Sequence, residues 1–165
     1  MRLPKFIICT LFLALCAYPA SAFTISTLSI DVGENGDCTA VFDYSMNFIE
    51  YIGYYTHIAN PAEEVKKEIS SRTSQQVDVV DVSDKGAEFK IYSFADTKDN
   101  NGSVTYTVPS LNFSKAEEVL KDHWISKITS FDLSPEVTTI TFPDGYIQEY
   151  DNEADIPQTV HTVQG

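Results

Sequence analysis

The stretch Ser110-Leu-Asn-Phe-Ser-Lys-Ala-Glu-Glu-Val119 predicts the end of a strand that runs into a capped helix, and it has an earlier counterpart. Ser45-Met-Asn-Phe48 and Ala62-Glu-Glu-Val65 occur in the same order. Each copy also follows an Asn-Gly pair, at Asn35 in the first copy and Asn101 in the second. This echo predicts a diverged internal duplication.

Hairpins account for most of the remaining pattern. Apolar residues alternate on either side of turn signals, which predicts hairpins over residues 23–48, 75–95 and 137–150. Residues 103–108 predict one more strand, and Asp96–Gly102 before it is polar enough to predict a loop.

Two helices are expected. Asn60 and Pro61 combine an N-cap side chain with proline at the first helical position, which predicts a helix to about Arg72. Ser114 and Glu117 form a capping box at the start of the second helix. Its apolar stripe at i, i+4 spacing comprises Ala116, Leu120, Trp124 and Ile128.

Together these elements predict an α+β fold. The expected architecture is two diverged ββαβ units plus a C-terminal strand, in antiparallel sheets with both helices packed on a face. The domain is expected to span residues 23–150, with halves 23–83 and 86–150. Residues 151–165 are polar, acidic and poor in apolar pattern, so they predict a flexible tail.

Residues 1–22 have the layout of a secretory signal peptide, with basic residues, a short apolar run and the small-residue motif Ala20-Ser21-Ala22. Cleavage there would leave 143 of the 165 residues and no membrane span. It would remove two of the 11 basic residues and none of the 24 acidic ones, which takes the net charge from −13 to −15. The expected location is therefore secreted or at the cell surface, and such an acidic chain disfavours nucleic acid as a partner.

Cys38 would be the only cysteine left after cleavage. Because it shares a strand face with Ala40, Phe42 and Tyr44, we expect a buried thiol, with an intermolecular bridge as the alternative. Asn101-Gly-Ser103 is the expected glycosylation site of an exported chain.

No local motif for catalysis or nucleotide binding is present, so the leading prediction is that the protein is not an enzyme and has no cofactor. Calcium is the one metal to weigh, since Asp96, Asp99 and Asn101 partly imitate an oxygen-rich calcium loop. A hydrolase with dispersed residues is the remaining alternative, and it would need His57 or His123 beside a carboxylate in a closed pocket.

The aromatic run from Phe48 to Ile58 has no counterpart in the second copy. We interpret it as a contact surface for a protein partner or for self-association into a dimer, and the alternative is a strand extension or short helix that completes the core. Its expected interface residues are Tyr51, Ile52, Tyr54, Tyr55 and His57. The predicted function is thus that of an exported, non-enzymatic surface or envelope protein that works by protein contact, and the alternative is an extracellular module that binds a small ligand or Ca²⁺.

Overall fold

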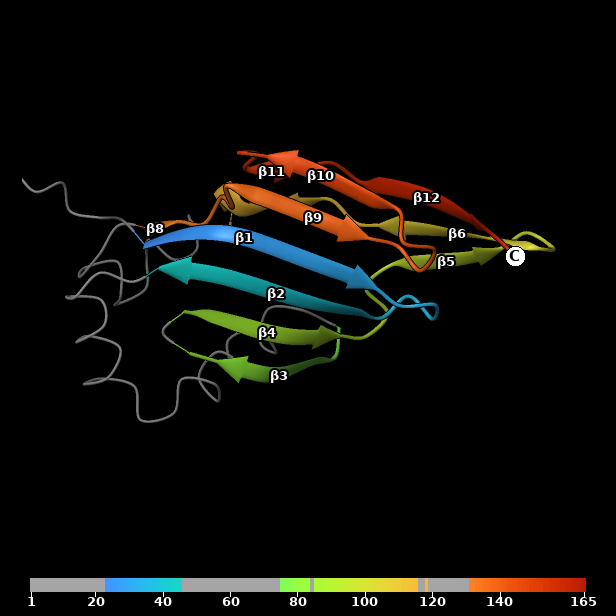
Figure 1. Cartoon of the computed structure of the whole chain (residues 1–165), viewed down its shortest axis with the longest axis horizontal. Coiled ribbons are helices and arrows are strands. Elements are labelled where there is room, and N and C mark those ends of the chain that lie inside the picture. Colours follow the sequence, from blue (N-terminus) through green and yellow to red (C-terminus); the bar gives the residue numbers. More distant parts are fainter. Residues whose placement is uncertain (1–22, 46–74, 84, 116–117, 119–130) are drawn as a thin grey trace, which may run out of the picture.

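The computed structural model describes residues 23–45, 75–83, 85–115, 118 and 131–165. Of these residues, 62% are in strands and 4% are helical, so the expected α+β class is wrong for the part of the chain that is described. The structure there is a two-layered β fold (Figure 1). No helix within these ranges has the length and apolar character needed to cross a membrane.

The first layer is a large mixed sheet, which we call sheet A. Its strands follow the order β10 (Ile147–Asp151), β9 (Val137–Thr141), β1 (Phe23–Val32), β2 (Cys38–Ser45), β4 (Gly86–Ile91) and β3 (Val77–Val82). The central strand β1 pairs antiparallel with β2 and parallel with β9. The short strand β8 (Phe131–Asp132) also pairs with β1.

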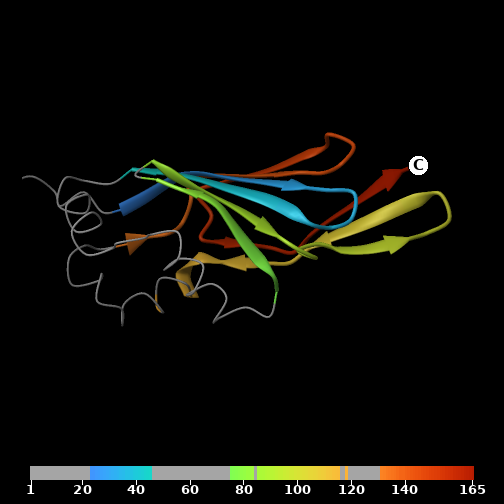
Figure 2. The same ribbon diagram turned by 90° about the horizontal axis from the view of Figure 1, so that it is seen from below.

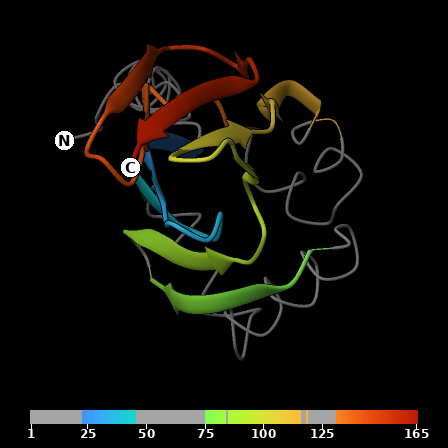
Figure 3. The same ribbon diagram turned by 90° about the vertical axis from the view of Figure 1, so that its right-hand side faces the viewer.

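The second layer is smaller. Sheet B has the order β12 (Thr159–Gln164), β6 (Ser103–Val108) and β5 (Asp96–Asp99). Beside it lies a two-stranded pair, β11 (Asp155–Ile156) and β7 (Leu111–Asn112). Figures 2 and 3 show this layer facing sheet A, with the β5–β6 hairpin projecting at one end of the molecule.

One hydrophobic core joins the two layers. Leu28, Ile30 and Ile140 of sheet A pack in the same cluster as Tyr106 and Val108 of sheet B. Ile140 and Val108 are completely buried. Because alternate residues of each strand point inward, both sheets keep their other face in solvent.

The three hairpins predicted from the sequence are confirmed. Strands β1 and β2, β3 and β4, and β9 and β10 each pair antiparallel. Their turns follow local chemistry: Gly36 and Gly145 both have positive φ, at 81° and 83°, which glycine adopts without steric cost.

The prediction of a loop over Asp96–Gly102 is wrong, because the first half of this segment is strand β5. Asn101 and Gly102 have φ values of 58° and 112°, so they turn the chain back into β6 within a hairpin. The polar residues of β5 are tolerated because all four are exposed on the edge of sheet B.

Residues 151–165, expected to be a flexible tail, are part of the fold. Strand β12 pairs with β6 along its whole length, and Ile156 of β11 is buried in the core. The inward side chains of β12 are Thr159, His161 and Val163. The prediction of a tail is wrong because only one of these three is apolar, so the sequence shows no clear apolar alternation here.

The described strands do not form two ββαβ units. Strand β4, in the expected half 86–150, pairs with β2 and β3 of the expected half 23–83, so the described strands of the two halves share one sheet. Strand order depends on contacts distant in sequence, which short local matches do not determine.

Described helical residues are limited to 113–115 and 118. The side chain of Asn112 accepts a hydrogen bond from the backbone N–H of Lys115 at 2.6 Å, so Asn112 is the N-cap and not Ser114. The helix predicted to end near Arg72 and most of the second predicted helix, Trp124 included, lie outside the described residues.

Candidate interaction site

Strand β12 forms an edge of sheet B with one side unpaired among the described residues. The N–H of Gly165 donates to the carbonyl of Gly102 at 2.7 Å, and this bond determines which residues of β12 hydrogen-bond β6. In an antiparallel pair, hydrogen-bonded positions alternate along each strand. Val160, Thr162 and Gln164 therefore direct their backbone N–H and C=O groups away from β6.

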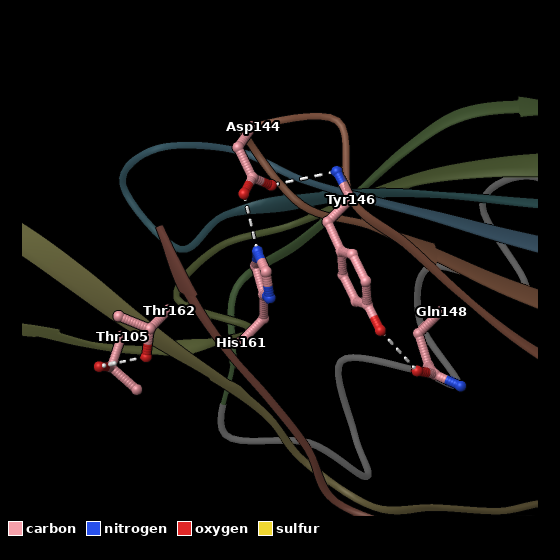
Figure 4. Close-up of polar contacts among 6 residues, drawn as sticks. All are labelled: Thr105, Asp144, Tyr146, Gln148, His161 and Thr162. Carbon is pink, nitrogen blue, oxygen red and sulfur yellow. Dashed lines mark hydrogen bonds and ion pairs between the residues drawn. The ribbon is translucent and has the colours of Figure 1, made fainter. Parts of the chain in front are cut away.

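The same three residues are exposed, and Val160 retains 58% of its accessible surface. The hydroxyls of Thr162 and Thr105 lie 3.0 Å apart across the strand pair, so the outer surface beside the edge is ordered by a side-chain hydrogen bond (Figure 4). The outward side chains of the neighbouring strand β6 are Ser103, Thr105 and Thr107, which carry no charge.

The other long edges in the described part of the chain are protected. Strand β10 carries Glu149 and Asp151, and β5 is charged at three of its four positions. Strand β3 carries two aspartates and has a register shift between Val79 and Asp81. Charges and bulges are the usual means by which proteins block pairing at sheet edges. Strand β12 has no bulge, since its pairing with β6 is regular, and its one ionisable side chain, His161, faces inward to Asp144.

A side-chain clasp holds β12 to sheet A. His161 Nε2 lies 2.8 Å from Asp144 Oδ2, with 20% of the histidine and 34% of the aspartate side chain exposed. Asp144 is in the Pro143-Asp-Gly145 turn between β9 and β10, and its other oxygen accepts the backbone N–H of Tyr146 at 3.1 Å. The turn therefore orients the carboxylate before it meets the histidine (Figure 4).

Aromatic rings cover the imidazole of the clasp. The ring of Tyr146 stacks on His161 with centroids 4.3 Å apart and planes 10° apart, and Phe142 lies 4.8 Å from it. The hydroxyl of Tyr146 donates to Gln148 Oε1 at 3.1 Å, and this hydrogen bond orients the tyrosine ring (Figure 4). Tyr106 of β6, the cross-strand partner of His161, completes the cluster, with its ring centroid 6.4 Å from that of Phe142.

Within the described residues, the contacts of this cluster join β12 to the β9–β10 hairpin. A carboxylate beside a histidine resembles the orienting half of a catalytic triad, but a nucleophile must reach the other ring nitrogen. Within the described residues, the only side chain that hydrogen-bonds His161 is that of Asp144. Stacking also occupies the ring, so the pair serves to fasten β12 against the β9–β10 hairpin.

The hydrogen bond with His161 and the N–H of Tyr146 hold the pKa of the Asp144 carboxyl below its ordinary value. A lowered carboxyl pKa stabilises the fold above the unfolded-state pKa, near 3.9, and this contribution is lost as the pH falls through the lower folded-state value. We therefore expect wild type to be more stable than Asp144→Asn at pH 5, and the difference to shrink below about pH 4. Urea denaturation of both proteins from pH 5 to pH 2 measures it. An identical pH dependence for both proteins would contradict the clasp.

The residues proposed for calcium do not converge. Asp96 and Asp99 are three positions apart in β5, so strand alternation sends their side chains to opposite faces. Asp99 Oδ1 instead accepts the backbone N–H of Asn101 at 2.9 Å, which closes the turn. Among the described residues, no three histidine, cysteine or acidic side chains are grouped as a metal site would need.

Asn101 lies exposed in the turn of the β5–β6 hairpin. The glycosylation itself stays a prediction. Cys38 is buried in the core, which agrees with the expected buried thiol, and burial raises its pKa to about 12.

The predicted interface residues Tyr51, Ile52, Tyr54, Tyr55 and His57 lie outside the described residues, as does His123. The hydrolase alternative, which depends on these two histidines, stays untested. The sequence reasoning missed His161, Asp144 and the β12 edge. One signal could have found the edge: six consecutive residues of β12 without aspartate, glutamate, lysine, arginine, proline or glycine, in an otherwise acidic chain.

The described residues define an acidic, two-layered β protein in which β12 is the one long sheet edge without outward charge or a bulge. No family model, no curated protein and no solved structure matches the chain.

Proposed function

We propose that this chain is an exported, non-enzymatic protein that acts by contact with a protein partner, and that the partner adds an extended strand to β12. The observation that carries the proposal is the outward row of backbone groups at Val160, Thr162 and Gln164 on an edge without an outward charge or a bulge. Strand addition draws its affinity from such main-chain hydrogen bonds.

The clasp supports this function by fixing the edge in advance. Because His161 is fastened to Asp144 and stacked on Tyr146, the backbone of β12 is ordered before a partner arrives. Less conformational entropy is then lost on binding, which favours association. The aromatic run from Phe48 to Ile58 remains a second proposed contact surface.

A synthetic, uncharged Thr-Val-Thr-Val-Thr-Val peptide tests the edge. We expect it to bind and to perturb the NMR amide signals of Val160, Thr162 and Gln164 more than those of the outward residues of β10. The same peptide with alternate amides N-methylated loses one row of donors and should fail to bind. Equal binding of both peptides would contradict strand addition.

A proline variant adds a test on the protein side. Thr162→Pro removes one outward N–H without removing a bond to β6, since Thr162 does not donate to that strand. We expect roughly tenfold weaker peptide binding, equivalent to about one hydrogen bond. Glu149→Pro, at an outward position of β10, is the matched control and should leave peptide binding unchanged.

A further inference from the structure

We propose that the partner at the β12 edge is a second copy of this chain, an inference that rests on the strand addition proposed above. The two β12 strands pair antiparallel about a twofold axis at Thr162. Sheet B then continues through the dimer as a six-stranded sheet.

The pairing register of the two β12 strands follows from which residues direct their backbone groups outward. An axis at Thr162 pairs it with its own copy and pairs Val160 with Gln164 of the partner subunit, so all three outward residues are used within β12. A twofold axis between residues 161 and 162 would bring all six residues of β12 into the pairing. It would, however, place residues whose backbone groups point outward opposite residues whose backbone groups point to β6. The hydrogen-bond phase therefore excludes that alternative.

Charge favours a second copy over a different partner. The chain carries a net charge of −13, so two copies repel wherever their acidic surfaces meet. On the outer side of β12 and of β6 there is no acidic or basic side chain to oppose the approach, since the one histidine of β12 faces inward to Asp144. A basic partner would instead gain from acidic edges such as β10, with Glu149 and Asp151.

Twofold pairing also limits the assembly to two copies. Pairing about a twofold axis uses the β12 edge of both molecules, and the edge left at each end of the joined sheet is β5. Asp96, Lys98 and Asp99 protect that strand, so the assembly stops at a dimer and does not extend into a fibre.

Light scattering of the full chain and of charge variants tests the dimer. Wild type should have the mass of a dimer that dissociates on dilution. Thr162→Lys places two lysines opposite each other across the axis, so self-association should weaken by roughly tenfold or more. Ile147→Lys is the matched control, because Ile147 is 57% exposed on the β10 edge, and it should remain dimeric. Thr162→Val removes the hydrogen bond to Thr105 without adding charge and should also remain dimeric.

A charge pair identifies the axis. Thr162→Glu alone should be as monomeric as Thr162→Lys, and mixing the two should restore a heterodimer, since opposite charges then face each other. Circular dichroism melts establish that each variant is folded.

The outcomes separate the two proposals. A monomeric wild type that still binds the Thr-Val peptide would overturn self-pairing and leave strand addition in place. A dimer indifferent to Thr162→Lys would overturn β12 as its interface. A wild type that neither dimerises nor binds the peptide would overturn both proposals.

Discussion

Replacing Phe142 by alanine is expected to lower the free energy of unfolding by about 3–5 kcal/mol, the cost usual for removing a buried phenylalanine. Phe142 directly follows β9 and is only 2% exposed. Its ring packs against the cross-strand pair Tyr106 of β6 and His161 of β12, at centroid distances of 6.4 and 4.8 Å. Alanine would leave a cavity at the place where the two layers and the clasp meet.

Urea denaturation at pH 7 measures the effect as a fall in the midpoint. Ile147→Ala on the same hairpin is the control, because that side chain is mostly exposed and its loss should change stability by no more than about 0.5 kcal/mol. If Phe142→Ala costs less than about 1 kcal/mol, the packing between the layers is not as described. Peptide binding by the folded variant should also weaken, since His161 loses one of its two ring contacts.

Local turn chemistry explains why the hairpins could be predicted. Asn35-Gly36 and Pro143-Asp-Gly145 specify tight turns, and the strands beside them alternate apolar and polar residues. Buried Cys38 followed from the same alternation. In each case a few neighbouring residues determine the structure.

Sheet order and the second layer could not be predicted in this way. The parallel pairing of β1 with β9 joins residues more than 100 positions apart, and no local pattern records it. Strand β12 turns Thr159 and His161 inward, where they hydrogen-bond Tyr150 and Asp144, so its inward face appears polar in the sequence. The interaction site was missed for the same reason, because an open edge is defined by which strands are absent beside it.

Gly36→Ala is expected to destabilise the protein by about 2 kcal/mol or more, from backbone strain together with a steric clash. Gly36 has φ of 81°, and a Cβ there would lie 2.4 Å from the carbonyl oxygen of Ala95. The approach is close because the carbonyl of Gly36 accepts the N–H of Ala95 at 2.9 Å, which ties the β1–β2 turn to the chain entering β5. Neither backbone can move away without breaking this bond.

Gly145→Ala separates the two causes. Gly145 has nearly the same φ, 83°, but a Cβ there would meet nothing within 4 Å among the described residues. It should therefore show the strain alone, about 1 kcal/mol. Thermal and urea denaturation of both variants gives the comparison. A Gly36→Ala protein no less stable than Gly145→Ala would mean that the β1–β2 turn does not press against Ala95, and that the link from sheet A to β5 is looser than this contact requires.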